Sequence, residues 1–209
     1  MHQEHRSLFN TLLAAGDPTG EHSLPVIGLA VQDAIYREAW GEARPYLDQL
    51  LAQRRSPRDI LFAYTVERGL GNRAAALSYA QELYETDPSN EEGLIAFISA
   101  LIDIGRRSEA AALLETRLAA PAGDGAGMKS RYYYLRSRLR TNEEAVMNDL
   151  RSSLFEDPRN LSALTAMFEI YHRRKDERRA VYYLKQALAL APDNARLKRY
   201  QKEYETAAE

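Results

Sequence analysis

The chain has 209 residues, of which 45% are hydrophobic and 28% are charged, and its formal net charge is −2. This balance predicts a folded chain and excludes a disordered one, and no apolar run approaches the roughly 20 residues that a bilayer span needs. The absence of cysteine excludes disulfides and thiolate chemistry, and it fits the cytoplasm or, for an exported protein whose signal has been removed, the periplasm.

Charge is distributed unevenly along the chain. Residues 1–127 carry 11 Lys and Arg against 18 Asp and Glu, whereas residues 128–209 carry 17 against 12. Such an asymmetry influences how a partner is attracted and says nothing about the fold.

The first segment, residues 1–23, is predicted to be a short helix followed by a linker. Leu8, Phe9, Leu12 and Leu13 have helical spacing, and Gly16–Ser23 is rich in turn residues.

Residues 24–194 show an internal repeat. Small side chains recur at the start of an apolar run with steps of 33, 34, 36 and 34 residues, at Ala43, Ala76, Ala110, Val146 and Ala180. The step from Asn160 to Asn194 is again 34 residues, as is the step from Gly71 to Gly105. The units are therefore expected to span 24–56, 57–90, 91–126, 127–160 and 161–194.

Each unit has the pattern of two helices joined by a short turn. In 161–194, the first helix is indicated by Leu164, Met167, Phe168 and Tyr171, and the second by Ala180, Leu184, Ala187 and Leu188. Gly105 is expected to adopt a left-handed conformation at a helix end. After the last unit, residues 195–209 are predicted to form a polar capping helix with an apolar stripe at Leu197, Tyr200 and Tyr204.

The unit length, the turn position and the residues Leu164, Tyr171, Ala180, Ala187 and Pro192 resemble the tetratricopeptide repeat. The resemblance covers roughly residues 24–194. It implies an all-α, right-handed superhelical solenoid of about five helix pairs. Phe168, Tyr134 and Tyr64 stand where the family usually has glycine or a small residue, which implies wider local packing.

Motifs for catalysis, metal binding or cofactor binding are not visible in the sequence. It has no nucleophile elbow, no phosphate-binding glycine loop and no zinc-binding H-E-x-x-H pattern. The four histidines, His2, His5, His22 and His172, do not form a recognisable ligand set. We therefore expect no enzyme activity, no metal and no cofactor.

By the resemblance, the first helix of each pair lines a concave groove. The implied partner-binding residues are Leu61, Thr65, Arg68, Ile95, Ser99, Ile102, Arg131, Tyr132, Leu135, Arg138, Thr165, Glu169, His172 and Arg173. Residues 128–140 carry five positive charges, no acid and three consecutive tyrosines. Tyr133 and Tyr134 are expected in the core, and Tyr132 is expected to face outward.

The favoured function is a protein-interaction scaffold that binds a peptide or partner helix with apolar anchors and an acidic end. The arginines could instead form only a solvated face. A nucleic-acid-binding helical repeat is an alternative, based on the arginines of 131–140 and 173–179, and a small-ligand carrier is another. The groove lacks the lysines and asparagines of a carboxylate clamp, so a chaperone tail is not expected. Exposed tyrosines leave self-association open.

Overall fold

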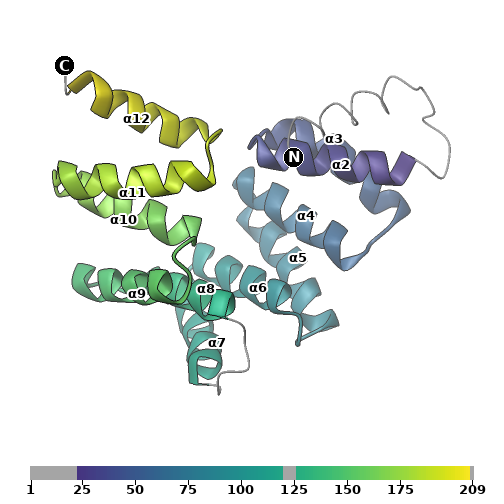
Figure 1. Cartoon of the computed structure of the whole chain (residues 1–209). Coiled ribbons are helices and arrows are strands. Elements are labelled where there is room, and N and C mark those ends of the chain that lie inside the picture. Colours follow the sequence, from purple (N-terminus) through teal and green to yellow (C-terminus); the bar gives the residue numbers. More distant parts are fainter. Residues whose placement is uncertain (1–22, 120–125, 208–209) are drawn as a thin grey trace. The chain divides into compact units, whose positions relative to one another are not determined.

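The computed structural model describes residues 23–119 and 126–207, so the helix predicted within residues 1–23 lies almost entirely outside the described residues. The described residues form eleven helices and no strand (Figure 1). The all-α prediction is confirmed. The helices are α2 (Ser23–Tyr36), α3 (Trp40–Gln53), α4 (Pro57–Gly69), α5 (Arg73–Thr86), α6 (Glu91–Asp103), α7 (Arg107–Ala119), α8 (Ala126–Ser137), α9 (Glu143–Glu156), α10 (Leu161–Arg173), α11 (Glu177–Leu190) and α12 (Ala195–Ala207).

The described chain divides into an N-terminal unit that ends at Arg106 and a C-terminal unit that begins at Arg107. In the N-terminal unit, α2 packs on α3, α3 on α4, α4 on α5 and α5 on α6. In the C-terminal unit, successive helices from α7 to α12 pack on one another in the same way. Each unit is thus a stack in which a helix contacts its neighbours in sequence, as in helical-repeat proteins.

Helix boundaries follow from local side-chain chemistry. The side chains of Ser56, Asn90, Asn142, Asn160 and Asp176 each accept a hydrogen bond from a backbone N–H in the first turn of the helix that they precede. These bonds satisfy donors that have no partner within the helix. At the carboxyl ends of α4 and α6, Gly71 and Gly105 have φ of +81° and +85°, which confirms the left-handed conformation expected of Gly105.

The core of each unit consists of apolar side chains from the facing sides of its helices. In the N-terminal unit, fully buried residues include Val31, Leu47, Leu50 and Val66. In the C-terminal unit, the core extends from Met147 and Leu150 on α9 to Leu197 on α12. The small residues that mark the repeat lie where helices meet, and Ala43, Ala76, Ala110 and Ala180 are at most 2% exposed.

The last helix closes the C-terminal core. Leu197 of α12 is 2% exposed, and Tyr200 and Tyr204 pack against the same cluster. The other side of α12 is exposed and charged. The prediction of a capping helix is confirmed.

Three aromatic residues occupy places where the repeat pattern usually has a small residue. Phe168 is fully buried and Tyr64 is 7% exposed, while Tyr134 is half-buried and packs against the C-terminal core.

A buried polar network joins α8, α9 and the start of α10. The hydroxyl of Ser130 donates to the carbonyl of Ser153 at 2.8 Å, and the hydroxyl of Ser153 donates to the carbonyl of Ser130 at 2.8 Å. The amide of Asn160 donates to both hydroxyls, at 2.9 and 3.1 Å, while its oxygen caps α10. Every member of this network is buried and hydrogen-bonded, so its position among the three helices is fixed.

The contact between α3 and α4 depends on a glycine. Gly69 lies against the indole ring of Trp40, and a Cβ added at Gly69 would lie inside contact distance of that ring. Buried Glu67 of α4 accepts hydrogen bonds from Arg44 of α3 and from Asn72, which precedes α5.

Gly69→Ala should lower the free energy of unfolding by about 1–3 kcal/mol, because the added methyl group overpacks the helix contact. Urea unfolding followed by the fluorescence of Trp40, the single tryptophan of the chain, measures the change. Gly41→Ala on α3 is the matched control, since a Cβ there meets nothing within 4 Å. Equal stability of the two variants would contradict this view of the contact.

A second prediction concerns the start of α4. The carboxylate of Asp59 is buried and accepts hydrogen bonds from Arg54 at 2.8 and 3.0 Å and from the backbone N–H of Ser56 at 3.1 Å. Burial favours the neutral acid, but the hydrogen bonds from Arg54 and Ser56 outweigh burial and lower the pKa of Asp59. A lowered pKa means that ionised Asp59 stabilises the fold above its unfolded pKa of about 3.9, and that this contribution is lost at lower pH.

Asp59→Asn should therefore cost about 1–2 kcal/mol at pH 7, and the difference from the parent should shrink as the pH falls from about 4 to 2. Urea unfolding at several pH values tests this. Asp48→Asn serves as the control, because the side chain of Asp48 is 58% exposed. A difference between Asp59→Asn and the parent that does not change with pH would show that the charge of Asp59 is irrelevant.

Candidate functional site

The first helices of the N-terminal unit share one face. Arg58 of α4 donates to the side-chain oxygen of Gln32 on α2 at 3.0 Å, and Arg68 of α4 pairs with Asp103 of α6 at 2.6 Å. These bonds bridge α2 to α4 and α4 to α6. The predicted residues Leu61, Thr65 and Arg68 therefore lie on a face that continues onto both neighbouring helices.

This face has an apolar floor. Ile95 and Ile102 of α6 are each 8% exposed and Ser99 between them is 6% exposed. On α4, Leu61 and Thr65 are half-buried, and the Thr65 hydroxyl donates to the Leu61 carbonyl at 2.8 Å. Arg68, whose side chain is 44% exposed, and Asp103 form their ion pair on the same face.

The prediction for Tyr132 is wrong. Tyr132 was expected to face outward together with Leu135, but the structure buries both, at 0% and 3% exposure. The two residues are three positions apart on one side of α8, so that side is turned inward. Three consecutive tyrosines cover most of the circumference of a helix, and the sequence alone does not say which ring is inside. Tyr134 packs against the core as expected, while Tyr133 is half-buried beside the Arg136 guanidinium, 5.1 Å away.

The arginines of α8 and the following turn differ in their surroundings. Arg136 and Arg140 both donate to the buried carboxylate of Asp149 on α9, with the Arg136 Nε at 3.0 Å and the Arg140 Nε at 2.9 Å. The ion pairs of these two arginines with Asp149 hold α8 and the turn after it against α9. Arg131 and Arg138, which were predicted to lie in the groove, are half-buried, and Arg131 lies 3.9 Å from the Met128 sulfur.

On α10, the predicted residues face the capping helix. Glu169 pairs with Arg196, and His172 Nδ1 is 2.7 Å from the Tyr204 hydroxyl. The His172 ring also lies edge-on to Tyr200, with 5.1 Å between ring centroids. Glu169 and His172 therefore help to attach α12. Thr165 is half-buried.

The basic run that begins at Arg173 is largely paired with acids. Arg173 and Arg174 both contact Glu143 of α9, at 3.5 and 2.5 Å, and Arg179 contacts Asp176 at 2.7 Å. The hydrogen bond from Arg174 is the largest cause of the lowered pKa of Glu143. This pairing reduces the net positive charge of the run.

Gln32 and Asp103 were not singled out in the sequence, and Arg196 and Tyr204 were assigned only to the capping helix, not to a contact with a groove residue. Each is on the first helix of a predicted unit or on the capping helix, at the same side as a predicted groove residue. The 33-residue step between the first two units relates Thr65 to Gln32 and would have identified it, whereas the repeat register does not relate Asp103, Arg196 or Tyr204 to a predicted groove residue.

Within residues 23–119 and 126–207, no group of three or more His, Asp or Glu side chains is arranged to hold a metal ion. In the same residues, no helix is both long enough and apolar enough to cross a membrane.

No protein-family model matches the sequence, and the search of curated proteins gave no match either. Among solved structures, MamA from Desulfovibrio magneticus RS-1, from residue 41 to its end, has 17% identity and a TM-score of 0.51, covering 84% of this chain and 98% of that one. The structure described as MamA RS-1 ArsTM double mutant gives the same identity and TM-score, with 88% and 98% covered. YrrB, described as a TPR protein with an unusual peptide-binding site, has 13% identity and a TM-score of 0.46, with 93% and 97% covered. The likeness to MamA, a tetratricopeptide-repeat protein, supports the resemblance stated from the sequence, and the chain has a tetratricopeptide-like fold.

Proposed function

We propose that the chain is a non-enzymatic protein-interaction scaffold that binds a peptide or a partner helix on the faces of its first helices. The observation that carries this proposal is the continuity of these faces, bridged by Arg58–Gln32 and Arg68–Asp103 in the N-terminal unit. A stack of helices with an uninterrupted side gives an extended surface of the kind that helical-repeat proteins use for binding.

The side chains on the face in the N-terminal unit suit an amphipathic partner. Half-buried Leu61 supplies apolar surface, and Thr65 with the Arg68–Asp103 pair supplies polar contacts, while Ile95 and Ile102 are almost fully buried. An apolar centre with a polar rim is the usual composition of a protein interface. A partner helix with one apolar stripe would complement it.

In the C-terminal unit, the proposed contacts are with acidic groups. Arg131 is on α8, Arg138 is in the turn that follows α8, and Arg173 at the end of α10 has a side chain that is 62% exposed. Arginine can form two parallel hydrogen bonds with one carboxylate, so these residues would select an acidic segment.

The double variant Arg131→Glu with Arg138→Glu should weaken binding of an acidic partner at least about tenfold, because attraction becomes repulsion at two positions. Random 12-residue peptides displayed on phage and selected on the full chain provide the probes. Their affinities for the parent and for the variant are then measured by fluorescence anisotropy.

A control variant with the same change in charge is Arg73→Glu with Lys202→Glu, since both side chains are exposed on α5 and α12. It should retain the affinity of the parent, and the helicity of both variants, measured by circular dichroism, should match that of the parent. Selected peptides that bind both variants equally well would refute the role of Arg131 and Arg138. A lack of any selected peptide would refute the scaffold itself.

A further inference from the structure

Two large aromatic side chains of the C-terminal unit are exposed on second helices, away from the residues of the proposed first-helix faces. Phe155 on α9 is 86% exposed and Tyr182 on α11 is 57% exposed. Single exposed apolar residues are common and need no explanation, whereas a contiguous group with a polar rim marks an interaction surface. The question is therefore whether Phe155 and Tyr182 belong to one surface.

The ring contacts of Tyr183 join α11 to α10. Tyr182 lies edge-on to Tyr183 at 5.1 Å, and Tyr183 stacks on Tyr171 of α10 at 5.6 Å with an angle of 6° between the rings. Arg151 of α9 and Lys185 of α11 are 34 residues apart, one repeat, so they occupy equivalent positions on the two second helices.

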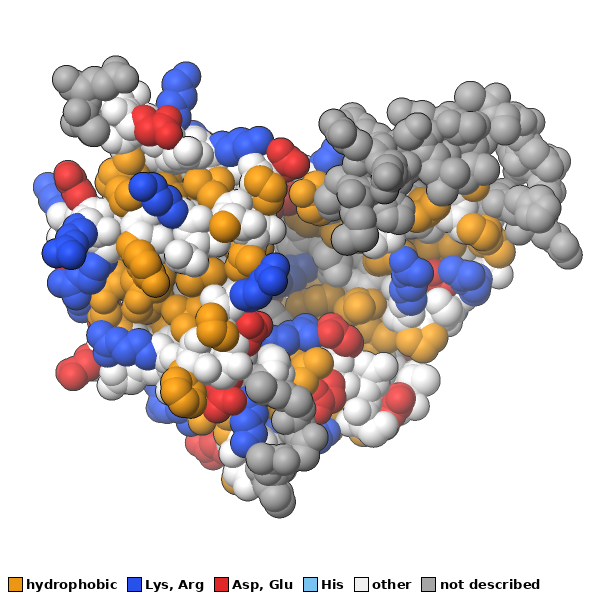
Figure 2. All heavy atoms as spheres, viewed as in Figure 1, with side chains coloured by type: hydrophobic (Ala, Val, Ile, Leu, Met, Phe, Trp, Pro, Cys, Tyr) orange, Lys and Arg blue, Asp and Glu red, His pale blue; other side chains and the backbone are white. Residues whose placement is uncertain are grey.

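Phe155 is one helical turn beyond Arg151 and therefore on the same side of α9. Figure 2 shows hydrophobic side chains gathered over α9, α10 and α11, with Lys and Arg side chains around them. We call the group of Phe155, Tyr182, Arg151, Arg159, Arg178 and Lys185 the second-helix surface.

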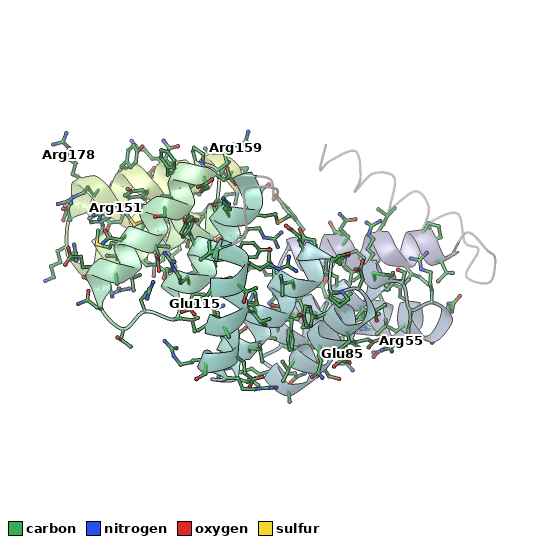
Figure 3. All side chains as sticks on the ribbon, turned by 90° about the horizontal axis from the view of Figure 1, so that it is seen from below. Arg55, Glu85, Glu115, Arg151, Arg159 and Arg178 are labelled. Carbon is green, nitrogen blue, oxygen red and sulfur yellow. The ribbon has the colours of Figure 1, made fainter. Side chains whose placement is uncertain are left out.

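The cations of this surface are less neutralised than others of the same unit. In the part of the chain that the structure describes, Arg159, Arg178 and Lys185 are exposed, and no carboxylate pairs with their side chains. The side chain of Arg151 donates to the Asn148 amide oxygen at 2.8 Å, which leaves its charge uncompensated. Figure 3 shows Arg159 and Arg178 extending outward from this part of the chain. By contrast, Arg136, Arg140 and Arg174 all face carboxylates.

Tyr182, one of the two aromatic side chains of the surface, contacts ordered rings before any partner arrives. Tyr183 lies between Tyr182 and Tyr171, and the Arg179 guanidinium covers Tyr171 at 4.7 Å. A ring that is already ordered loses little conformational entropy on binding, and exposed tyrosine and arginine are frequent interface anchors.

We propose that the second-helix surface is a separate docking site for an acidic peptide segment that carries an aromatic or aliphatic anchor residue. Charge complementarity favours this partner, since carboxylates would compensate Arg151, Arg159, Arg178 and Lys185 while the anchor covers Phe155 or Tyr182. Acidic side chains at the amino ends of both helices, Glu144 and Glu177, interrupt the positive surface. That interruption suits a short acidic segment better than a continuous polyphosphate chain.

The test uses the full chain and a fluorescein-labelled peptide of ten residues, with two phenylalanines among Asp and Glu, titrated by fluorescence anisotropy at low salt. The parent should bind this peptide. Phe155→Ser with Tyr182→Ser should weaken binding at least tenfold, and Arg151→Glu with Lys185→Glu should abolish it. The same peptide with serine in place of phenylalanine should bind at least tenfold more weakly.

Two control variants locate the binding. Leu70→Ser with Arg73→Glu changes an exposed leucine and an exposed arginine of the N-terminal unit, and it should bind as the parent does. Arg73→Glu with Lys202→Glu, which changes two exposed cations outside both proposed surfaces, should also bind as the parent does. Phe155 and Tyr182 are outside the first-helix faces, so loss of binding in the Phe155→Ser with Tyr182→Ser variant tests this proposal separately from the first-helix proposal. All altered side chains of the second-helix surface are exposed, and circular dichroism with thermal unfolding should show an intact fold.

Four results would overturn the proposal. The first is no binding of the acidic peptide by the parent. The second is a double variant, Phe155→Ser with Tyr182→Ser, that binds the acidic peptide as tightly as the parent does. The third is binding of a twelve-nucleotide oligothymidylate that is as tight as that of the peptide and lost in the same variants, which would assign the surface to nucleic acid. The fourth is a parent that self-associates in analytical ultracentrifugation while the variants do not, which would assign it to a second copy of the chain.

Discussion

The close crossing of neighbouring helices is the interaction on which the fold depends. Neither helix of a pair can bury its apolar side alone, and two helix axes approach to about 8–10 Å only if small side chains lie at the crossing. Ala43, Ala76, Ala110 and Ala180 occupy these places and are almost completely buried. A larger side chain there would separate the helices and open the core on both sides of the contact. The approach of Gly69 to Trp40 is another case of the same constraint, at the contact of α3 with α4.

The architecture could be predicted from sequence because its determinants are local and repeat. Asn160 and Asp176 cap helices where they stand, Gly105 permits a left-handed turn, and the spacing of Leu164, Met167 and Tyr171 defines one face of a helix. None of these signals requires knowledge of a distant contact.

The side-chain environment of the candidate site was less predictable, because it depends on which partners arrive from other helices. Tyr132 and Tyr133 are neighbours of the same type, yet one is buried in the interior and the other is half-exposed beside Arg136. The engagement of His172 by Tyr204 of α12 joins residues that are 32 positions apart. The exposure of Phe155 could not be predicted from the sequence for a similar reason, since helical spacing alone does not distinguish an outer position from a core position.

The buried hydrogen bonds among Ser130, Ser153 and Asn160 have a consequence for the history of the sequence. Asn160 caps α10 and also donates to both hydroxyls. If any one of these three residues is replaced by an apolar one, polar atoms of the other two lose a hydrogen-bond partner in the interior. Their replacement by apolar side chains would have to be concerted, and a single step towards it would be selected against. In an alignment of relatives, these positions should be inherited together, and a chain that has lost one serine should also have lost the other.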